Sequence, residues 1–214
     1  MDASFWHQKW DKKEIAFHEG DTNLLLMAHV DKLKLLTGSR IFIPLCGKTR
    51  DIAWLLSCDY KIVGAELSEV AIQELFAELG VEPEVTKEGA FTVYRALDID
   101  IFVGDIFNVT ADVLGHVDAV YDRAALVALN ESLRSRYAEH LIEVTHSAAQ
   151  LLITYEYDQT VIPGPPFSVN ETLVHQYYDP MYELTFVERQ DIEGGLKGKV
   201  ASTETVWLLQ KRVG

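Results

Sequence analysis

The feature that most constrains the fold is a regular alternation of apolar and amphipathic segments from residue 40 onward. Five apolar segments predict strands, at residues 40–45, 61–67, 99–107, 117–123 and 149–158. Helical patterns lie between them, at residues 50–59, 68–80 and 130–145. Apolar strands that are followed by helices are typical of a mostly parallel sheet covered by helices on both faces.

The end of the chain has a different pattern. Residues 182–195 and 204–212 predict a terminal hairpin, which places an antiparallel strand at or near one edge of the sheet. We therefore predict an α/β fold with a doubly wound, mostly parallel sheet of seven strands. Ligands of such sheets bind outside the carboxyl ends of the strands, so the residues just after each strand are the candidates for a site.

The first 40 residues are rich in Trp, His, Lys and Glu and predict short amphipathic helices. Between residues 23 and 36, apolar side chains at steps of three predict one buried helical face. These side chains are Leu24, Met27, Val30, Leu33 and Leu36. Gly38 predicts the end of that helix. With no linker in 214 residues, we expect a single domain, with residues 1–38 as a helical cap or lid and 39–214 as the core.

Composition excludes several classes of protein. The formal net charge is −14, whereas nucleic-acid binding depends on a basic surface, so we expect no nucleic-acid partner. Two cysteines, Cys46 and Cys58, are too few for a disulfide framework or a structural zinc site. The first residues lack the apolar core of a signal peptide, and no apolar run is long enough to cross a bilayer. We expect a cytoplasmic protein.

The turn after the first strand contains Gly47-Lys48-Thr49, which matches the end of a triphosphate-binding loop. Such a loop also needs a glycine five residues earlier, where this chain has Phe42. A dinucleotide fingerprint needs three glycines, and this turn has one. The turn is therefore either a simple strand-to-helix connection or part of a site that holds no phosphate.

Two further strands end in carboxylates. Glu66 follows Gly47 by about 20 residues and can accept both hydroxyls of a ribose; the alternative is a cap for the next helix, although Ser68 already suits that role. Asp105 ends the third strand beside apolar Ile106, which suits an adenine; the alternative is a loop aspartate that stabilises a turn.

Arg123 follows the fourth strand, next to Asp122. It is expected either to hold an anionic or aromatic substrate or to pair with a carboxylate such as Asp122. Together, the ends of four strands supply Gly47, Glu66, Asp105 and Arg123, which indicates a nucleoside site without a pyrophosphate cradle. A nucleoside that carries no phosphate points to S-adenosylmethionine.

Five segments resemble the thiopurine S-methyltransferases, in the bacterial branch that is also linked to tellurite resistance. They are FWHQKWDKKEIAFHEG, IFIPLCGKTRDIAWL, VGAELSEVAI, GDIF and VYDRAALVALN. The resemblance runs from about Phe5 to the final strand. It implies a class I S-adenosylmethionine-dependent methyltransferase fold with an N-terminal helical lid. The first motif has fewer glycines than the general class I pattern.

The resemblance also implies roles for individual residues. Trp10 would pack over the methionine part of the cofactor, and Leu45 and Gly47 would form the turn beside it. Glu66 would bind the ribose, and Asp105 and Ile106 would border the adenine. Arg123 would lie near the methionine carboxylate and the substrate, with Phe17 on the substrate side. His18, next to Phe17, is a further substrate candidate. The cofactor-binding set is thus Trp10, Leu45, Gly47, Glu66, Asp105, Ile106 and Arg123.

The expected reaction is methyl transfer to the sulfur of thiopurines or aromatic heterocyclic thiols. The resemblance extends the expected acceptors to selenium and tellurium species, and relatives of the fold methylate small thiols and halides. Two other functions remain open, a nicotinamide oxidoreductase and a non-enzymatic nucleoside-binding protein. The seven histidines show no metal-ligand spacing, so we expect no metal, and we expect a monomer.

Two later segments, residues 154–169 and 131–141, predict a loop and a helical face. Residues 154–169 contain Pro163, Pro165 and Pro166, so they predict a stiff loop, which is either a substrate wall or an ordinary surface loop. Its aromatic side chains, Tyr155, Tyr157 and Phe167, are candidate pocket residues. The charged pattern of residues 131–141 predicts a solvated helical face.

Overall fold

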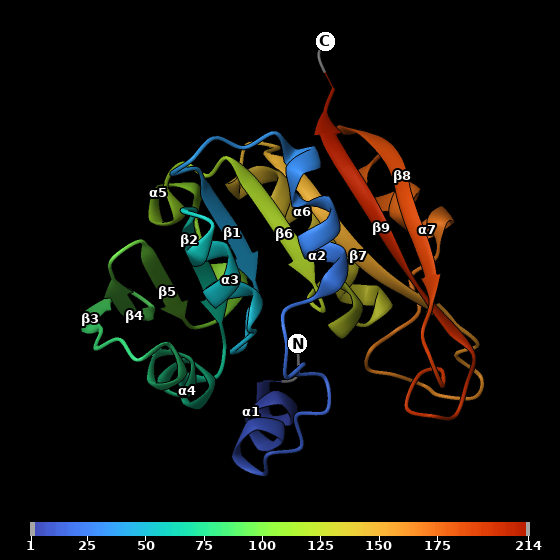
Figure 1. The fold of residues 1–214 in the computed structure, drawn as a ribbon, viewed down its shortest axis with the longest axis horizontal. Coiled ribbons are helices and arrows are strands. Elements are labelled where there is room, and N and C mark those ends of the chain that lie inside the picture. The colour runs from blue at the N-terminus through green and yellow to red at the C-terminus, as the bar shows by residue number, and fades with distance from the viewer. Residues whose placement is uncertain (1–2, 213–214) are drawn as a thin grey trace. The chain divides into compact units, whose positions relative to one another are not determined.

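A computed structural model describes residues 3–212 of the chain (Figure 1). Residues 1–2 and 213–214, the ends of the predicted domain, lie outside the described part. The fold divides into two compact units, residues 1–119 and 120–214. Each unit contributes strands with helices packed against them.

The first unit contains five strands in the order β3-β4-β5-β2-β1. Their bounds are β1 (Arg40–Pro44), β2 (Lys61–Glu66), β3 (Glu84–Glu88), β4 (Phe91–Ala96) and β5 (Ile99–Val103). β2 pairs in parallel with β1 and with β5, and Glu66 is in register with Val103. β4 runs antiparallel to both β3 and β5. The parallel strands are almost wholly buried, which explains their continuous apolar sequence.

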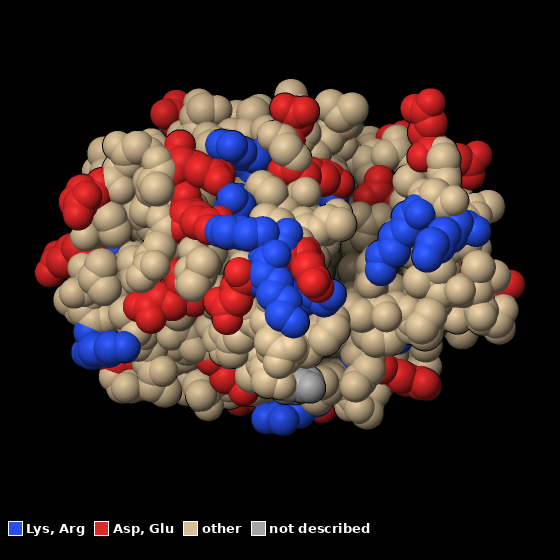
Figure 2. Space-filling model, turned by 90° about the horizontal axis from the view of Figure 1, so that it is seen from below, with Lys and Arg blue, Asp and Glu red and all other residues tan. Residues whose placement is uncertain are grey.

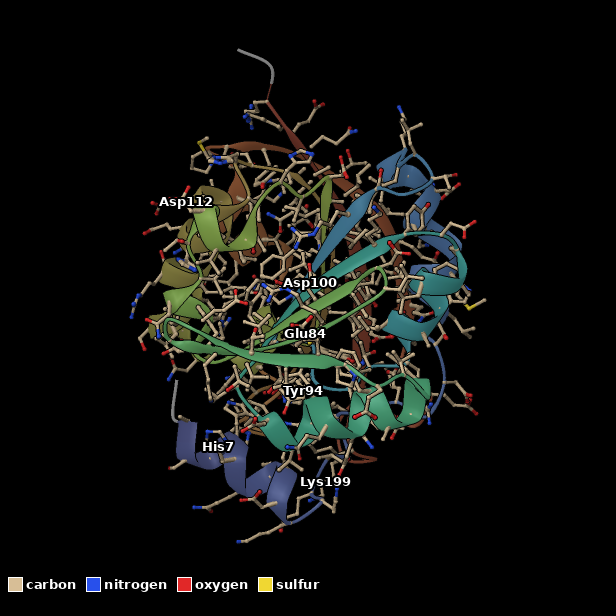
Figure 3. All side chains as sticks on the ribbon, turned by 90° about the vertical axis from the view of Figure 1, so that its left-hand side faces the viewer. His7, Glu84, Tyr94, Asp100, Asp112 and Lys199 are labelled. Atoms are coloured by element: carbon tan, nitrogen blue, oxygen red, sulfur yellow. The ribbon has the colours of Figure 1, made fainter. Side chains whose placement is uncertain are left out.

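Helices of the first unit begin and end largely where local chemistry predicts. They are α1 (Ala3–Asp11), α2 (Leu24–His29), η1 (Val30–Leu33), α3 (Asp51–Ser57), α4 (Glu69–Leu79), η2 (Ile106–Asn108) and α5 (Ala111–Leu114). Ser68 caps α4 by accepting a hydrogen bond from the Ala71 amide, and Gly80 ends it at φ 68°. Tyr94 of β4 reaches α4, where its hydroxyl donates to Glu69 over 3.0 Å (Figure 3).

The predicted buried face of residues 23–36 is correct for Val30 and Leu33, which are buried, and wrong for its other three members. Leu24 and Leu36 are 76% and 79% exposed, whereas Leu25 and Leu26 are buried. The α-helix ends at His29, and a 3₁₀ turn continues to Leu33. A step of three residues falls short of the 3.6-residue helical repeat, so the row of side chains drifts around the helix and leaves the core.

The second unit contains four strands in the order β6-β7-β9-β8. Its elements are β6 (Ala119–Arg123), η3 (Leu126–Ala128), α6 (Glu131–Val144), β7 (Ala149–Tyr157), α7 (Glu171–Tyr178), β8 (Tyr182–Asp191) and β9 (Ser202–Lys211); β6 starts at the last residue of the first unit. β9 is antiparallel to both β7 and β8, as the predicted terminal hairpin requires. Residues 158–170 contain no helix or strand, as the prolines predict.

The predicted fold class is confirmed, but the described residues contain nine strands rather than seven. The two additional strands are β3 and β4, and their antiparallel pairing makes the sheet mixed rather than mostly parallel. β3 has no buried residue, so its sequence, EVTKE, lacks an apolar face that would reveal it. Among residues 3–212, no helix has the length and apolar character needed to cross a membrane.

Candidate active site

Gly47 and Glu66, nominated separately from the sequence, are in direct contact. The Glu66 side chain reaches from the end of β2 to the turn after β1, where one carboxylate oxygen accepts from the Gly47 amide over 2.8 Å. The other oxygen accepts from the Ser68 amide, also over 2.8 Å. A carboxylate offers about four acceptor positions, and the Leu67 amide also donates to this one, so capacity is left for a further donor. Ribose hydroxyls are donors of that kind.

The first turn has a tightly wound backbone. Leu45 and Gly47 both have positive φ values, 48° and 52°. A Cβ atom placed on Gly47 would lie 3.1 Å from the indole of Trp10, which is buried. Trp10 of α1 therefore packs directly on the glycine, and α1 lies beyond the carboxyl ends of β1 and β2 (Figure 1). The turn lacks the room and the amides of a phosphate loop.

Lys48, the lysine of the apparent phosphate-loop motif, points to α4. Its ammonium group lies 3.0 Å from Glu74 and 2.7 Å from Glu78. Arg50 lies 3.4 Å from Glu78, and Lys13, between α1 and α2, also pairs with Glu74. On the face of the molecule shown in Figure 2, basic and acidic side chains likewise lie next to one another. Lys48 therefore anchors the turn to α4. Because its charge is paired with carboxylates, the turn does not act as a triphosphate-binding loop.

The carboxylate of Glu66 is buried, with 6% of the residue exposed. Burial raises its pKa, while hydrogen bonds from the amides of Ser68, Gly47 and Leu67 act in the opposite direction. The charge of His7, which lies on α1, also lowers the pKa (Figure 3). The Cys46 thiol is buried nearby, and burial raises its pKa as well, so it is not a nucleophile.

Asp105 and Ile106 follow the neighbouring strand, β5. The Gly104 amide donates to the Glu66 carbonyl over 2.8 Å, which joins the ends of β5 and β2. The exposed Asp105 caps η2, since one carboxylate oxygen accepts from the Phe107 amide over 3.0 Å. The Ile106 side chain is buried. Asp105 therefore fulfils the turn role that the sequence left open, and its second oxygen stays available to a ligand at the same strand end.

Aromatic side chains of the N-terminal segment extend outward from Trp10. Phe17 makes edge-to-face contacts with Trp10 and Trp6, with ring centroids 5.5 and 5.6 Å apart. Trp6 in turn meets Phe5 at 5.2 Å. His18, half-buried, follows Phe17. The structure thus joins Phe17 to Trp10 and Gly47, and the aromatic row supplies a partly exposed apolar surface.

Arg123 belongs to the second unit, at the end of β6. Its guanidinium donates to the Tyr155 hydroxyl of β7 over 3.4 Å. Asp122 accepts hydrogen bonds from the Leu126 amide and the Tyr137 hydroxyl. Tyr155, a candidate from the proline-rich segment, is therefore the neighbour of Arg123.

Sequence reasoning missed Arg134. The charged pattern of α6 predicted a solvated face, but Arg134 is 4% exposed and donates to the carbonyls of Leu129 and Ser168. Its guanidinium also lies 5.7 Å from the ring centre of Phe167. Arg134 therefore fixes the loop that follows β7. No local signal distinguishes such an arginine from a surface one.

Among the residues that the structure describes, no three His, Cys, Asp or Glu side chains converge as a metal site would require. The residues present at the carboxyl ends of β1, β2 and β5 fit an adenosyl group instead. A buried carboxylate with spare acceptor capacity faces a turn whose glycine leaves no space for a phosphate cradle. An S-adenosylmethionine molecule has a ribose and an adenine but no phosphate.

Solved structures of similar fold are methyltransferases. An S-adenosylmethionine-dependent methyltransferase from Anabaena variabilis has a TM-score of 0.67 and 14% identity, over 98% of this chain and 95% of that one. A Burkholderia thailandensis 1,6-didemethyltoxoflavin-N1-methyltransferase, solved with S-adenosylhomocysteine, has a TM-score of 0.64 and 13% identity, over 98% and 87%. The protein therefore has the class I S-adenosylmethionine-dependent methyltransferase fold.

The sequence itself specifies the family. The family model of thiopurine S-methyltransferase matches residues 1–212. The thiopurine S-methyltransferase of Xanthobacter autotrophicus is 51% identical over 212 residues, covering 99% of this chain and all of that protein. That of Teredinibacter turnerae is also 51% identical, over 100% and 99%. The chain belongs to the thiopurine S-methyltransferase family, and S-adenosylmethionine is its cofactor.

Proposed function

We propose that this protein methylates the sulfur of thiopurines and related aromatic heterocyclic thiols. The observation that carries the proposal is the family match over residues 1–212, combined with the contact between Gly47 and Glu66. The acceptor is thus a small molecule. Bound S-adenosylmethionine supplies an activated methyl group on a sulfonium sulfur.

The first unit holds the cofactor in this proposal. Glu66 accepts the ribose hydroxyls with the acceptor capacity that the three backbone amides leave available. Asp105 and Ile106 border the adenine at the end of β5. Trp10 and the backbone of Leu45 and Gly47 enclose the methionine portion, and an indole face suits the neighbouring sulfonium cation.

Arg123, Phe17 and His18 serve the acceptor. Heterocyclic thiols lose their proton readily, so sulfur is anionic near neutral pH and needs little help from a general base. Arg123 attracts that charge, Tyr155 orients the guanidinium, and Phe17 offers a flat surface to the ring. Correct alignment of the reacting atoms accounts for roughly 7–11 kcal/mol of the barrier reduction.

Residues 1–38 act as a lid over a single methyltransferase domain, residues 39–214 forming its core. Support comes from Trp10, which packs on Gly47, and from the ion pair between Lys13 and Glu74. Removal of residues 1–20 is expected to weaken S-adenosylhomocysteine binding at least tenfold, because Trp10 and Phe17 are lost. Isothermal titration calorimetry measures this affinity, and an unchanged value would count against the lid.

Further acceptors, the lack of nucleic-acid binding, cellular location and oligomeric state are proposed from chemistry and composition. Selenide and telluride anions are soft nucleophiles like thiolates, so these reduced species are proposed as further acceptors, with a role in tellurite resistance. The net charge of −14 supports a protein that does not bind nucleic acid. We further propose a cytoplasmic monomer.

The proposal is tested with radiolabelled S-adenosylmethionine and a panel of thiopurines, small thiols, selenite and tellurite. The expected result is transfer to a thiopurine, with saturation by both substrates. Binding of S-adenosylhomocysteine without transfer to any acceptor would instead indicate a nucleoside-binding protein. Binding of NADH in its place would favour an oxidoreductase.

A further inference from the structure

Asp122 is a buried carboxylate to which the proposed reaction gives no direct role. None of the residue is exposed. One carboxylate oxygen accepts from the Leu126 amide over 3.1 Å, and the other accepts from the Tyr137 hydroxyl over 2.8 Å. The Ala125 amide also donates to this carboxylate. A buried carboxylate is costly unless its oxygens are satisfied, and here the surrounding protein satisfies both.

These hydrogen bonds enclose the turn that carries Arg123. The chain leaves β6 at Arg123, passes through Ala124 at φ 64°, and enters η3 at Leu126. A positive φ is unfavourable for alanine, so the turn needs support from outside its own backbone. Asp122 supplies that support, because its side chain spans the turn from the residue before Arg123 to the residues after Ala124.

Tyr137 fixes Asp122 from the other side. It lies in the middle of α6, fully buried, so its hydroxyl has a defined position. Burial raises the pKa of the Tyr178 hydroxyl on α7, and the nearby charge of Asp122 raises it further. The Asp122 carboxylate therefore joins the β6 turn to the helical layer of the second unit.

We infer that Asp122 and Tyr137 are positioning residues, which hold the β6 turn so that the Arg123 guanidinium meets the acceptor. The inference rests on the proposed role of Arg123. It concerns hydrogen-bond geometry more than charge. An asparagine at position 122 keeps both contacts, because its oxygen accepts from Leu126 and its amide group donates to the Tyr137 hydroxyl oxygen.

The test compares Asp122→Ala, Asp122→Asn and Tyr137→Phe, each alone and together with Arg123→Ala. Steady-state kinetics with a thiopurine gives kcat and the KM for S-adenosylmethionine. Asp122→Ala is expected to lower kcat about 10- to 100-fold with little change in that KM, since a small misplacement near the chemistry has effects of this size. Asp122→Asn recovers most of the loss, and Tyr137→Phe loses less than Asp122→Ala.

The decisive comparison is the effect of Asp122→Ala in a protein that also carries Arg123→Ala. If Asp122 acts through Arg123, then Asp122→Ala lowers kcat no further once Arg123 is absent, so the two effects are strongly non-additive. Tyr182→Phe is the matched control. It removes another buried hydroxyl of the second unit, which donates to the Ala148 carbonyl and accepts from Gln150, and it should leave kcat unchanged.

Two outcomes would overturn the inference: additive losses in the double variants, or equal losses in Asp122→Asn and Asp122→Ala. Urea unfolding identifies conditions under which each variant is fully folded. If Asp122→Ala does not fold, Tyr137→Phe with and without Arg123→Ala decides by the same criterion. The proposed function fails separately, because it requires that the wild-type protein transfers methyl groups at all.

Discussion

Two turns of this protein contain an unfavourable backbone conformation, and each is stabilised by a different buried carboxylate. The turn after β1 and the turn after β6 each contain a non-glycine residue with positive φ, Leu45 at 48° and Ala124 at 64°. Each is held by a carboxylate that accepts backbone amide protons, Glu66 in the first unit and Asp122 in the second. In both cases the carboxylate compensates for an unfavourable backbone conformation.

The difference lies in where the carboxylate comes from and what else surrounds it. Glu66 reaches across from a neighbouring strand, is 6% exposed, and accepts from three amides just after the ends of β1 and β2. Asp122 spans its own turn, is fully buried, and its second oxygen is taken by the Tyr137 hydroxyl. We expect Glu66 to be shared between fold and ligand, whereas Asp122 serves the fold alone and acts on the reaction through Arg123.

The largest expected effect concerns Arg123, which only the second turn presents. Arg123→Ala should lower kcat about 100-fold or more, because the group that holds the anionic sulfur in line with the methyl group is lost. The melting temperature should stay close to that of the wild type. Wild-type turnover would contradict this role, and a lost melting transition would assign Arg123 to folding instead.

Glu66 is the corresponding test of the first turn. Glu66→Gln should weaken S-adenosylhomocysteine binding about 10- to 100-fold, since hydrogen bonds to a charged acceptor contribute about 1.5–3 kcal/mol each. Calorimetry measures the affinity. Glu69→Gln, three residues further on, removes a carboxylate that accepts from Tyr94 and is the control. Equal affinities in the two variants would contradict the ribose role.

A comparison of Gly47 with Gly38 tests the contact between the first turn and Trp10. Gly47→Ala and Gly38→Ala both place a methyl group on a residue with positive φ, 52° and 81°, and each should cost about 1–2 kcal/mol of unfolding free energy. Only at Gly47 does the new atom meet Trp10, at 3.1 Å; at Gly38 nothing lies within 4 Å. Cofactor affinity should therefore fall in Gly47→Ala alone. An equal loss of affinity in Gly38→Ala would show that the contact with Trp10 is not the cause.

The last prediction concerns stability rather than function and is a pH dependence of the free energy of unfolding. Burial raises the pKa of Asp122 from 3.8 to about 6, so the folded state binds a proton more tightly than the unfolded state between these values. The resulting stabilisation is full below about pH 4 and is lost as pH rises through about 6, a change of about 3 kcal/mol. Comparing urea unfolding of wild type and Asp122→Asn isolates it. If the free energy of unfolding changes equally with pH in both proteins, Asp122 does not titrate in this range.

Several local features were predictable because short-range chemistry decides them. Ser68 and Gly80 bound α4 as expected, and the buried strands β1, β2 and β5 are continuous apolar runs. Glu66 was identified from its position after a strand, because parallel strands bring their carboxyl ends to one edge. The contact of its carboxylate with Gly47 follows from that same geometry.

Other features depended on partners distant in the sequence. β3 escaped prediction because none of its residues is buried, and Arg134 reads like a surface residue until its two carbonyl partners are known. Lys48 belongs to a phosphate-loop motif in the sequence and to an ion-pair cluster with α4 in the structure. The expected place of Trp10 beside the cofactor came only from the family resemblance, and its packing on Gly47 was not predicted.

The α/β class, the ends of several helices and the identity of the residues at the strand ends follow from the local pattern of the chain. They do so because strand burial, helix caps and glycine turns are set by neighbours a few residues away. Only the tertiary structure decided which of those residues touch. The folded chain leaves one buried carboxylate at the carboxyl ends of the strands and encloses the other, because burial and hydrogen-bond partners arise from segments that meet only after folding.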